Sequence, residues 1–226
     1  TNITVSNATI ADTYGSLLFY TNGCQIANRF HQIMDNGDSL NFGEVFNVRC
    51  NESAFGYPAG PQSCLILPVP DNSDNYLVFH DKIEHVYEPE FDVITLSLLF
   101  TRVNVLIDRV IEKNISVIQD SISAGQLTAV KQSNGIDWWV IVPQYLSNKY
   151  YYFELTENGI ENLSEQQIGN PTVKQGEGGG QAVFSPDGTK YIRYTPADGL
   201  FIFDFGRNTG QLSNFRFIAI DDGAFT

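Results

Sequence analysis

The sequence is short of cysteine, histidine and long apolar runs. Its 226 residues include three Cys, three His and one Met. Three cysteines are too few for a fold held together by disulfides. A chain of this length can bury a core without disulfide or metal support. No apolar run approaches the roughly 20 residues that a membrane-spanning helix needs, so we expect no transmembrane segment. The most apolar run, 91–100, is typical of a buried strand.

Basic residues are also scarce. The 13 Lys and Arg residues stand against 26 Asp and Glu residues, and the formal net charge is -13 at pH 7. A surface of this sign repels the phosphates of DNA and RNA. The composition therefore argues against a nucleic-acid partner.

Aromatic residues and tight turns are abundant by contrast. The chain has 16 Phe and 11 Tyr, which favour strands over helices. In the stretch 182–195, an apolar run is followed by Asp187-Gly188 and then by a second apolar run. Asp and Gly tolerate the positive φ angles that a two-residue hairpin turn needs. The stretch therefore predicts a β-hairpin.

The same order of apolar run, turn and apolar run occurs in four parts of the chain. The first turn of each part is expected at Gly15, around Asn75, at Asn134-Gly135 and at Asp187-Gly188. The steps between them are roughly 60, 60 and 53 residues, close to the longer propeller repeats. A fifth copy is expected to begin at 215–223.

These repeats predict an all-β protein, with residues 1–226 forming a single β-propeller domain. We expect four-stranded blades, about four of them, plus the first strand of a fifth. Closed propellers have typically 4 to 8 blades, so four blades could close alone, but the unfinished fifth indicates that the chain is part of a larger propeller. The first residue is Thr and no leader precedes it, which also indicates a processed product or a piece of a longer chain. An open blade edge would favour self-association.

Cys50 and Cys64 flank the polar loop 51–63. A disulfide between them would contribute about 3 kcal/mol on the chain-entropy model. Two unpaired buried thiols are the alternative. If the bridge forms, Cys24 is left over.

No sequence motif predicts a catalytic, cofactor or metal site. The Gly-rich stretch 175–180 lacks the Lys-Ser or Lys-Thr of a phosphate-binding loop and fits a loop between blades. The stretch 71–76 ends in Tyr76, where a calcium loop needs Gly. His80 and His85 do not have the spacing that brings two imidazoles together on one helical face. There is no Gly-x-Ser-x-Gly nucleophile motif either.

Trp138, Trp139 and Tyr151 are the candidate ligand-contacting residues. Exposed aromatic rings can stack on a sugar or a peptide. Successive residues of a strand face opposite sides, however, and both faces of a blade meet neighbouring blades. Burial in the core is therefore the alternative role for these three rings.

Four segments follow one another in the order of a known family pattern. They are GSLLFYTNGCQIANRFHQIMDNG at 15–37, QSCLILPVPDNSDNYLVF at 62–79, LTAVKQSNGIDWWV at 127–140 and SPDGTKYIRYTPADGLFIFDFGRNTGQLSN at 185–214. The chain thereby resembles a family of WD40-like propeller proteins that Bacteroidota secrete or display at the cell surface, many of them through the type IX system. Cys24 and Ala27 depart from that pattern, and 80–112 matches it only loosely.

The resemblance implies an extracellular or cell-surface location and a propeller architecture. It supplies no catalytic residues, and it implies a structural hydrogen bond for His31. The function expected is therefore a non-catalytic binding or structural module that contacts a protein or a glycan. A lactonase-type or hydrolase-type enzyme with a metal in the propeller channel is one alternative. A subunit of an extracellular polymer is another.

Overall fold

The computed structural model describes residues 3, 5–52, 56–86, 92–172, 180–196 and 198–220, with the backbone alone at 85, 86, 92 and 93. Its contacts divide the chain into two compact units. Unit 1 comprises residues 1–68 and 72–121, and unit 2 comprises residues 69–71 and 122–226. None of the helices in the described ranges has the length and apolar character needed to cross a bilayer.

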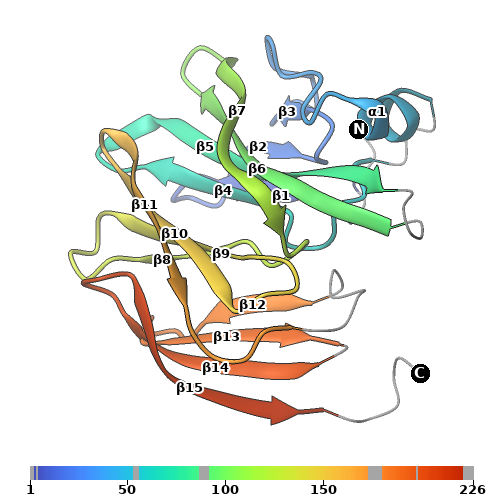
Figure 1. Ribbon diagram of the computed structural model, residues 1–226. Coiled ribbons are helices and arrows are strands. Elements are labelled where there is room, and N and C mark those ends of the chain that lie inside the picture. The colour runs from blue at the N-terminus through green and yellow to red at the C-terminus, as the bar shows by residue number, and fades with distance from the viewer. Residues whose placement is uncertain are drawn as a thin grey trace. The chain divides into compact units, whose positions relative to one another are not determined.

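Unit 1 contains two antiparallel sheets, drawn in blue to green in Figure 1. The first has the order β1-β2-β3, and the second has the order β4-β5-β6-β7. A short helix and one π-helical turn lie between β3 and β4. The bounds are β1 (Ala8–Ala11), β2 (Leu17–Thr21), β3 (Ile26–Asn28), α1 (Glu44–Phe46), η1 (Asn47–Glu52), β4 (Cys64–Val69), β5 (Asn72–Val86), β6 (Asp92–Asn104) and β7 (Arg109–Ile122).

Unit 2 contains two four-stranded antiparallel sheets, with the orders β11-β10-β9-β8 and β12-β13-β14-β15. The bounds are β8 (Thr128–Lys131), β9 (Trp138–Pro143), β10 (Lys149–Thr156), β11 (Gly159–Gln167), β12 (Gln181–Phe184), β13 (Lys190–Thr195), β14 (Gly199–Gly206) and β15 (Gln211–Ala219). In every sheet, strands that follow one another in sequence are neighbours. The all-β prediction is confirmed, whereas closure of these sheets into a propeller ring stays a prediction.

Two expected boundaries are wrong. The turn between β4 and β5 lies at Asp71, which has φ 53°, whereas Asn75 lies inside β5 and pairs with Asn104. Polar residues are tolerated there because this end of the hairpin is solvent-exposed. The expected start of a fifth blade is wrong for Phe215 to Ala219, because these residues belong to β15, the fourth strand of its sheet. Residues 221–223, and 175–179 of the Gly-rich stretch, lie outside the described residues.

The first turns of three sheets are tight and contain a glycine with positive φ. Gly15, Gly135 and Gly188 have φ angles of 82°, 74° and 71°, and each N–H donates to the carbonyl three residues earlier. Asn134 accepts the N–H groups of the two residues after Gly135. Asp187 accepts from the Ser185 hydroxyl, which is the main cause that lowers the pKa of this carboxyl to about 2. Polar side chains thus fix these turns locally.

In each unit the two sheets bury apolar side chains against each other. The core of unit 1 is formed by Phe19, Ile26, Met34, Leu40, Ile66, Val78, Val103 and Val110. The core of unit 2 is formed by Trp139, Ile141, Tyr150, Ala182, Tyr191, Phe201, Phe203, Phe205 and Leu212. Burying each large apolar side chain contributes about 1.5–3 kcal/mol before entropy costs, so these two cores hold the sheets together.

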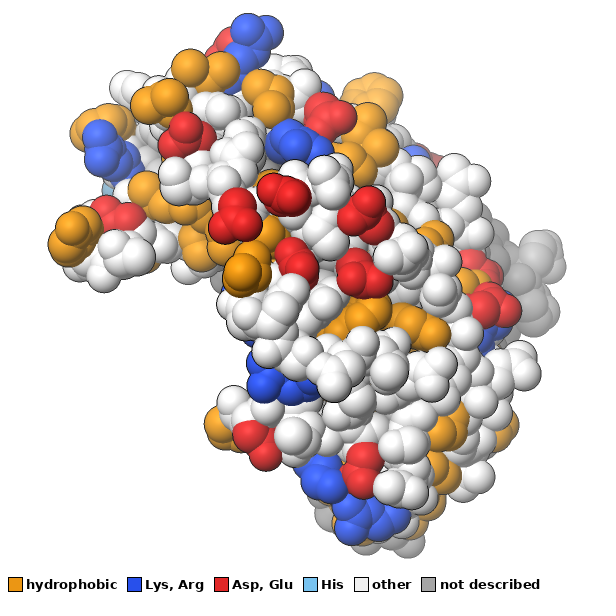
Figure 2. Space-filling view, turned by 90° about the vertical axis from the view of Figure 1, so that its left-hand side faces the viewer, with side chains coloured by type: hydrophobic (Ala, Val, Ile, Leu, Met, Phe, Trp, Pro, Cys, Tyr) orange, Lys and Arg blue, Asp and Glu red, His pale blue; other side chains and the backbone are white. Residues whose placement is uncertain are grey.

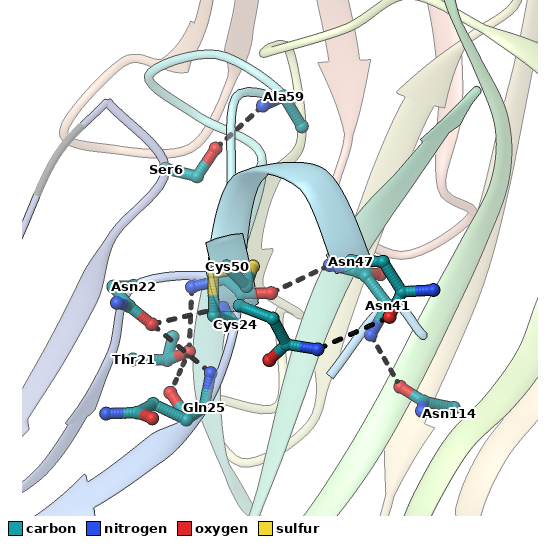
Figure 3. The surroundings of a disulfide bond; sticks show 12 residues. Ser6, Thr21, Asn22, Cys24, Gln25, Asn41, Asn47, Cys50, Ala59 and Asn114 are labelled. Carbon is teal, nitrogen blue, oxygen red and sulfur yellow. Dashed lines mark hydrogen bonds between the residues drawn. A yellow bond between two sulfur atoms is a disulfide. The ribbon is translucent and has the colours of Figure 1, made fainter. Parts of the chain in front are cut away.

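A disulfide joins Cys24 to Cys50, with their Cα atoms 5.8 Å apart, and Figure 3 shows its surroundings. The expected Cys50–Cys64 bridge is wrong. Cys24 lies in the turn between β2 and β3, and η1 carries Cys50 to it beside the buried side chains of Phe46 and Tyr57. Cys64 is a free, buried thiol at the start of β4, and burial raises its pKa to about 12.

Hydrogen bonds fix the turn that carries Cys24. The Thr21 hydroxyl donates to the carbonyl of Gln25 at 2.8 Å. The Asn22 side-chain oxygen accepts from the N–H groups of Cys24 and Gln25, as the dashed lines in Figure 3 show. The disulfide therefore anchors the segment between β3 and β4 to a rigid part of the first sheet.

Removing this disulfide should destabilise unit 1. We expect the double variant Cys24→Ser/Cys50→Ser to lose about 3 kcal/mol in free energy of unfolding, because the bridge closes a loop across 26 residues. Urea unfolding with and without a thiol reductant measures this. The reductant should lower the free energy of unfolding of the natural chain and of Cys64→Ala, and it should leave that of the double variant unchanged. A reductant-insensitive natural chain would contradict the assignment.

Candidate functional site

Two loops of unit 1 expose large apolar side chains. The first loop, 29–34, follows β3 and exposes Phe30 (66%) and Ile33 (50%). The second, 105–108, joins β6 to β7 and exposes Leu106 (74%) and Ile107 (60%). Figure 2 shows hydrophobic side chains at its upper end, the end at which Figure 1 places the β6–β7 turn. Grouped exposed apolar side chains are typical of interaction sites. We call these two loops the loop surface.

Asn28 holds the first loop in place and ties it to the second. Its side-chain oxygen accepts from the N–H groups of Phe30 (3.0 Å) and Gln32 (3.1 Å). Its amide donates to Asp108 Oδ2 at 2.7 Å. One buried side chain therefore sets the conformation of loop 29–34 and its position against loop 105–108.

The second loop is fixed in a similar way. The Asn104 side-chain oxygen accepts from the N–H groups of Leu106 (3.1 Å) and Ile107 (3.2 Å). At the end of this loop, Arg109 Nε lies 3.1 Å from Asp35 Oδ2. The backbone of the loop surface is thus held by the protein itself.

A pocket of about 270 Å³ lies in the loop surface. Its lining is Leu18, Asn28, Arg29, Phe30, Met34, Val105, Leu106 and Asp108. The Arg29 guanidinium lies 5.0 Å from the centroid of the Phe30 ring, within range of a cation–π contact. An apolar lining with a few polar groups suits an apolar group of a ligand that is flanked by polar or charged atoms.

His31 contributes a hydrogen bond next to this pocket. Its Nδ1 lies 3.2 Å from the Tyr20 hydroxyl, and the two rings meet edge to face. The resemblance implied a structural hydrogen bond here, and this contact confirms it. The backbone of His31 has φ 62°. The contact with Tyr20 therefore supports a loop residue in an uncommon conformation.

His80 is fully buried in unit 1 and makes two hydrogen bonds. Since the amide of Asn41 donates to the Gly23 carbonyl, its Oδ1 accepts from His80 Nδ1 at 2.7 Å. His80 Nε2 then accepts from the Thr101 hydroxyl at 3.0 Å, and Thr101 Oγ1 accepts from the N–H of Asn114. Burial lowers the pKa of His80 to about 3. This imidazole is therefore neutral, and its two buried hydrogen bonds give it a structural role.

The three predicted ligand-contacting aromatics lie in unit 2 and do not form one binding face. Trp139 belongs to the core, and its indole N–H donates to the carbonyl of Arg207 at 2.8 Å. Trp138 and Tyr151 share the opposite face of the sheet but lie at its two ends, paired with Leu155 and Val142.

Lysine side chains already contact the two rings on that opposite face. The Lys131 ammonium is 4.0 Å from the centroid of a Trp138 ring. The Lys149 ammonium is 5.1 Å from the Tyr151 centroid and donates to its hydroxyl. A ligand that stacks on the ring face beneath either cation would have to displace that cation.

The loop surface was not found from the sequence. A signal exists in the stretch 104–108, where three apolar residues stand between Asn and Asp at a hairpin tip that is normally polar. A second signal is Asn28, a residue type that often bonds the backbone two residues on. Neither signal shows that the two loops meet.

In the described ranges, no group of three or more His, Cys, Asp or Glu side chains could hold a metal ion. Comparisons with known protein families, with curated proteins and with solved structures give no match. The loop surface is therefore interpreted from its own geometry and chemistry alone.

Replacing Asn28 should loosen the loop surface while the sheets stay folded. We expect Asn28→Ala to raise amide hydrogen exchange at Phe30 and Gln32 by about 5- to 30-fold. The hydrogen bonds that Asn28 accepts stabilise the folded loop by about 1–2 kcal/mol, and the substitution removes them. Exchange read by mass spectrometry or NMR measures this. Asn158→Ala, in an exposed turn of unit 2, should leave the two amides unchanged. Equal exchange in both variants would contradict the role of Asn28.

His80 should make the stability of unit 1 depend on pH. Its pKa is near 3 in the folded state and 6.5 when exposed, so the unfolded chain binds the extra proton between these values. Stability present above pH 6.5 is lost as the pH falls towards 3, by on the order of 4 kcal/mol. Urea unfolding at a series of pH values gives the free energy of unfolding as a function of pH. His80→Gln should reduce the slope of this dependence between pH 3 and pH 6.5. An unchanged slope would contradict the assignment.

Proposed function

We propose that the chain is a non-catalytic binding module that acts at the cell surface or in a secreted assembly. Its loop surface docks an apolar side chain of a protein partner. The observation that carries this proposal is that Phe30 and Leu106 are strongly exposed beside one pocket, while Asn28 and Asn104 fix the loops that present them.

Fixed loops favour binding because less conformational entropy is lost when the partner docks. Binding hot spots are enriched in aromatic residues and arginine, and they cluster around pockets. Phe30 and Arg29 are such residues, and they line the pocket together. The loop surface thus combines exposure, rigidity and suitable side chains.

A protein partner fits this surface better than a glycan does. Sugar hydroxyls need free donors and acceptors, and the pocket's Asn28 and Asp108 already bond each other. Of the exposed apolar side chains named above, Phe30 alone offers an aromatic face for a sugar ring, whereas Leu106, Ile107 and Ile33 are aliphatic. An apolar side chain from a peptide or a protein loop would match these surfaces directly.

Two further observations support a location outside the cytoplasm. The Cys24–Cys50 disulfide is of the kind that persists in oxidising compartments. The four segments described above resemble those of secreted and cell-surface propellers of Bacteroidota.

The net charge of -13 makes nucleic acid an unsuitable partner.

Selection from a displayed random-peptide library, run in parallel with a glycan array, tests the proposal. We expect peptides with apolar anchors to bind the natural chain, and Leu106→Asp to weaken them by about 30-fold or more, the cost of losing a hot-spot contact. The matched control is Leu163→Asp, an exposed leucine on β11 of unit 2.

Selected peptides that bind both variants equally would refute the proposal, as would binding to glycans that is lost in Leu106→Asp. Circular dichroism of each variant confirms that the sheets are intact. Leu106 is mostly exposed, so its replacement should not disturb the core.

A further inference from the structure

In the sheet β12–β15 of unit 2, successive side chains of β13 and β14 alternate strictly between a buried face and a partly buried face. One face is fully buried against the neighbouring sheet of its unit and includes Tyr191, Phe201 and Phe203. The residues between these three lie on the opposite face and are only partly buried. The four strands lie side by side in Figure 1. The second face is therefore the accessible face of this sheet.

This accessible face is largely apolar, although Gln181 of β12 and Arg216 of β15 complete its two rows. One cross-strand row consists of Val183, Ile192 and Ile202. The next row contains Tyr194, Leu200 and Ile218. Val183 is 55% exposed and Ile218 is 51% exposed. An antiparallel sheet that faces water normally carries polar residues on that side, so this face has the composition of one that is covered.

Charged residues border the two apolar rows. Lys190 pairs with Asp204 across β13 and β14 and forms an ion pair with it. Arg216 of β15 stands at the edge of the first row and lies 3.9 Å from Asp204. The Lys190 ammonium is the main cause that lowers the pKa of Asp204. An apolar centre with a charged border is the usual anatomy of a protein interface.

We propose that this face packs against the same face of a second copy of the chain and forms a two-fold dimer. In both units, the described sheets bury their apolar faces against another sheet. A second copy supplies such a sheet with the same apolar rows. A two-fold axis makes one surface self-complementary, because each patch meets its own equivalent.

The charges support a second copy as the occupant. Two copies with a net charge of -13 each repel one another over most of their surfaces. The accessible face, however, carries two cations, Lys190 and Arg216, and one anion, Asp204, whereas Arg193 of β13 lies on the buried face. This face therefore does not share the acidic excess of the chain, and Asp204 of each copy is an anion that the cations of the other copy can attract. Arg216 ends the first row on β15, and the β13 and β14 positions of both rows carry no charge, so none needs to be desolvated there.

Sedimentation velocity over 1–200 µM tests the dimer. We expect a concentration-dependent mass that reaches twice that of one chain. Val183→Lys should weaken dimerisation at least tenfold, because it places an unpaired cation from each copy in an apolar row of the interface. Leu163→Lys is the matched control, since Leu163 is a similarly exposed apolar residue (48%) on β11. It should dimerise like the natural chain.

A natural chain that stays monomeric throughout this range overturns the proposal. So does a dimer that Val183→Lys and a second variant, Ile218→Lys, leave unchanged. The dimer is independent of the proposed function, because its residues lie in unit 2. Leu106→Asp should therefore dimerise normally, and the two proposals can fail separately.

Discussion

The packing of one antiparallel sheet on another is the constraint on which the rest of the structure depends. In unit 2, Tyr150 of one sheet contacts Phe203 and Tyr191 of the next edge to face, with ring centroids 5.2 and 6.0 Å apart. Aromatic pairs in this geometry add about 0.5–1.5 kcal/mol beyond area burial. Because a strand directs alternate residues to opposite faces, the need to cover each sheet dictates the two-residue pattern of β13 and β14.

That constraint explains which parts of the fold the sequence could predict. A tight turn depends on residues within a few positions, so the turns at Gly135 and Gly188 were accessible to local reasoning. The role of 215–219 was not, because the fourth strand of one sheet and the first strand of the next show the same alternation. The predicted Cys50–Cys64 disulfide was wrong for a related reason. Cys50 pairs with Cys24, 26 residues away, and only the folded path of η1 brings them together.

The loop surface was harder to foresee than the fold. Asn28 and Asn104 are local turn formers that a sequence can show, but the hydrogen bond from Asn28 to Asp108 spans 80 residues. Nor does composition mark Phe30 or Leu106 as exposed, since the same residue types fill both cores. Exposure is a property of the pairing of β6 with β7, which places the apolar stretch at a hairpin tip instead of within a strand.

The two apolar surfaces differ in the kind of contact that they can make. The loop surface presents single side chains around a pocket of about 270 Å³, which suits one anchor residue and allows discrimination between partners. The accessible face of β12–β15 is a sheet surface, so its affinity for a partner would come from buried area and from a shape that matches another sheet. A surface of the first kind favours recognition and one of the second kind favours assembly. Strands can therefore supply a flat surface and turns can supply anchors within one all-β chain.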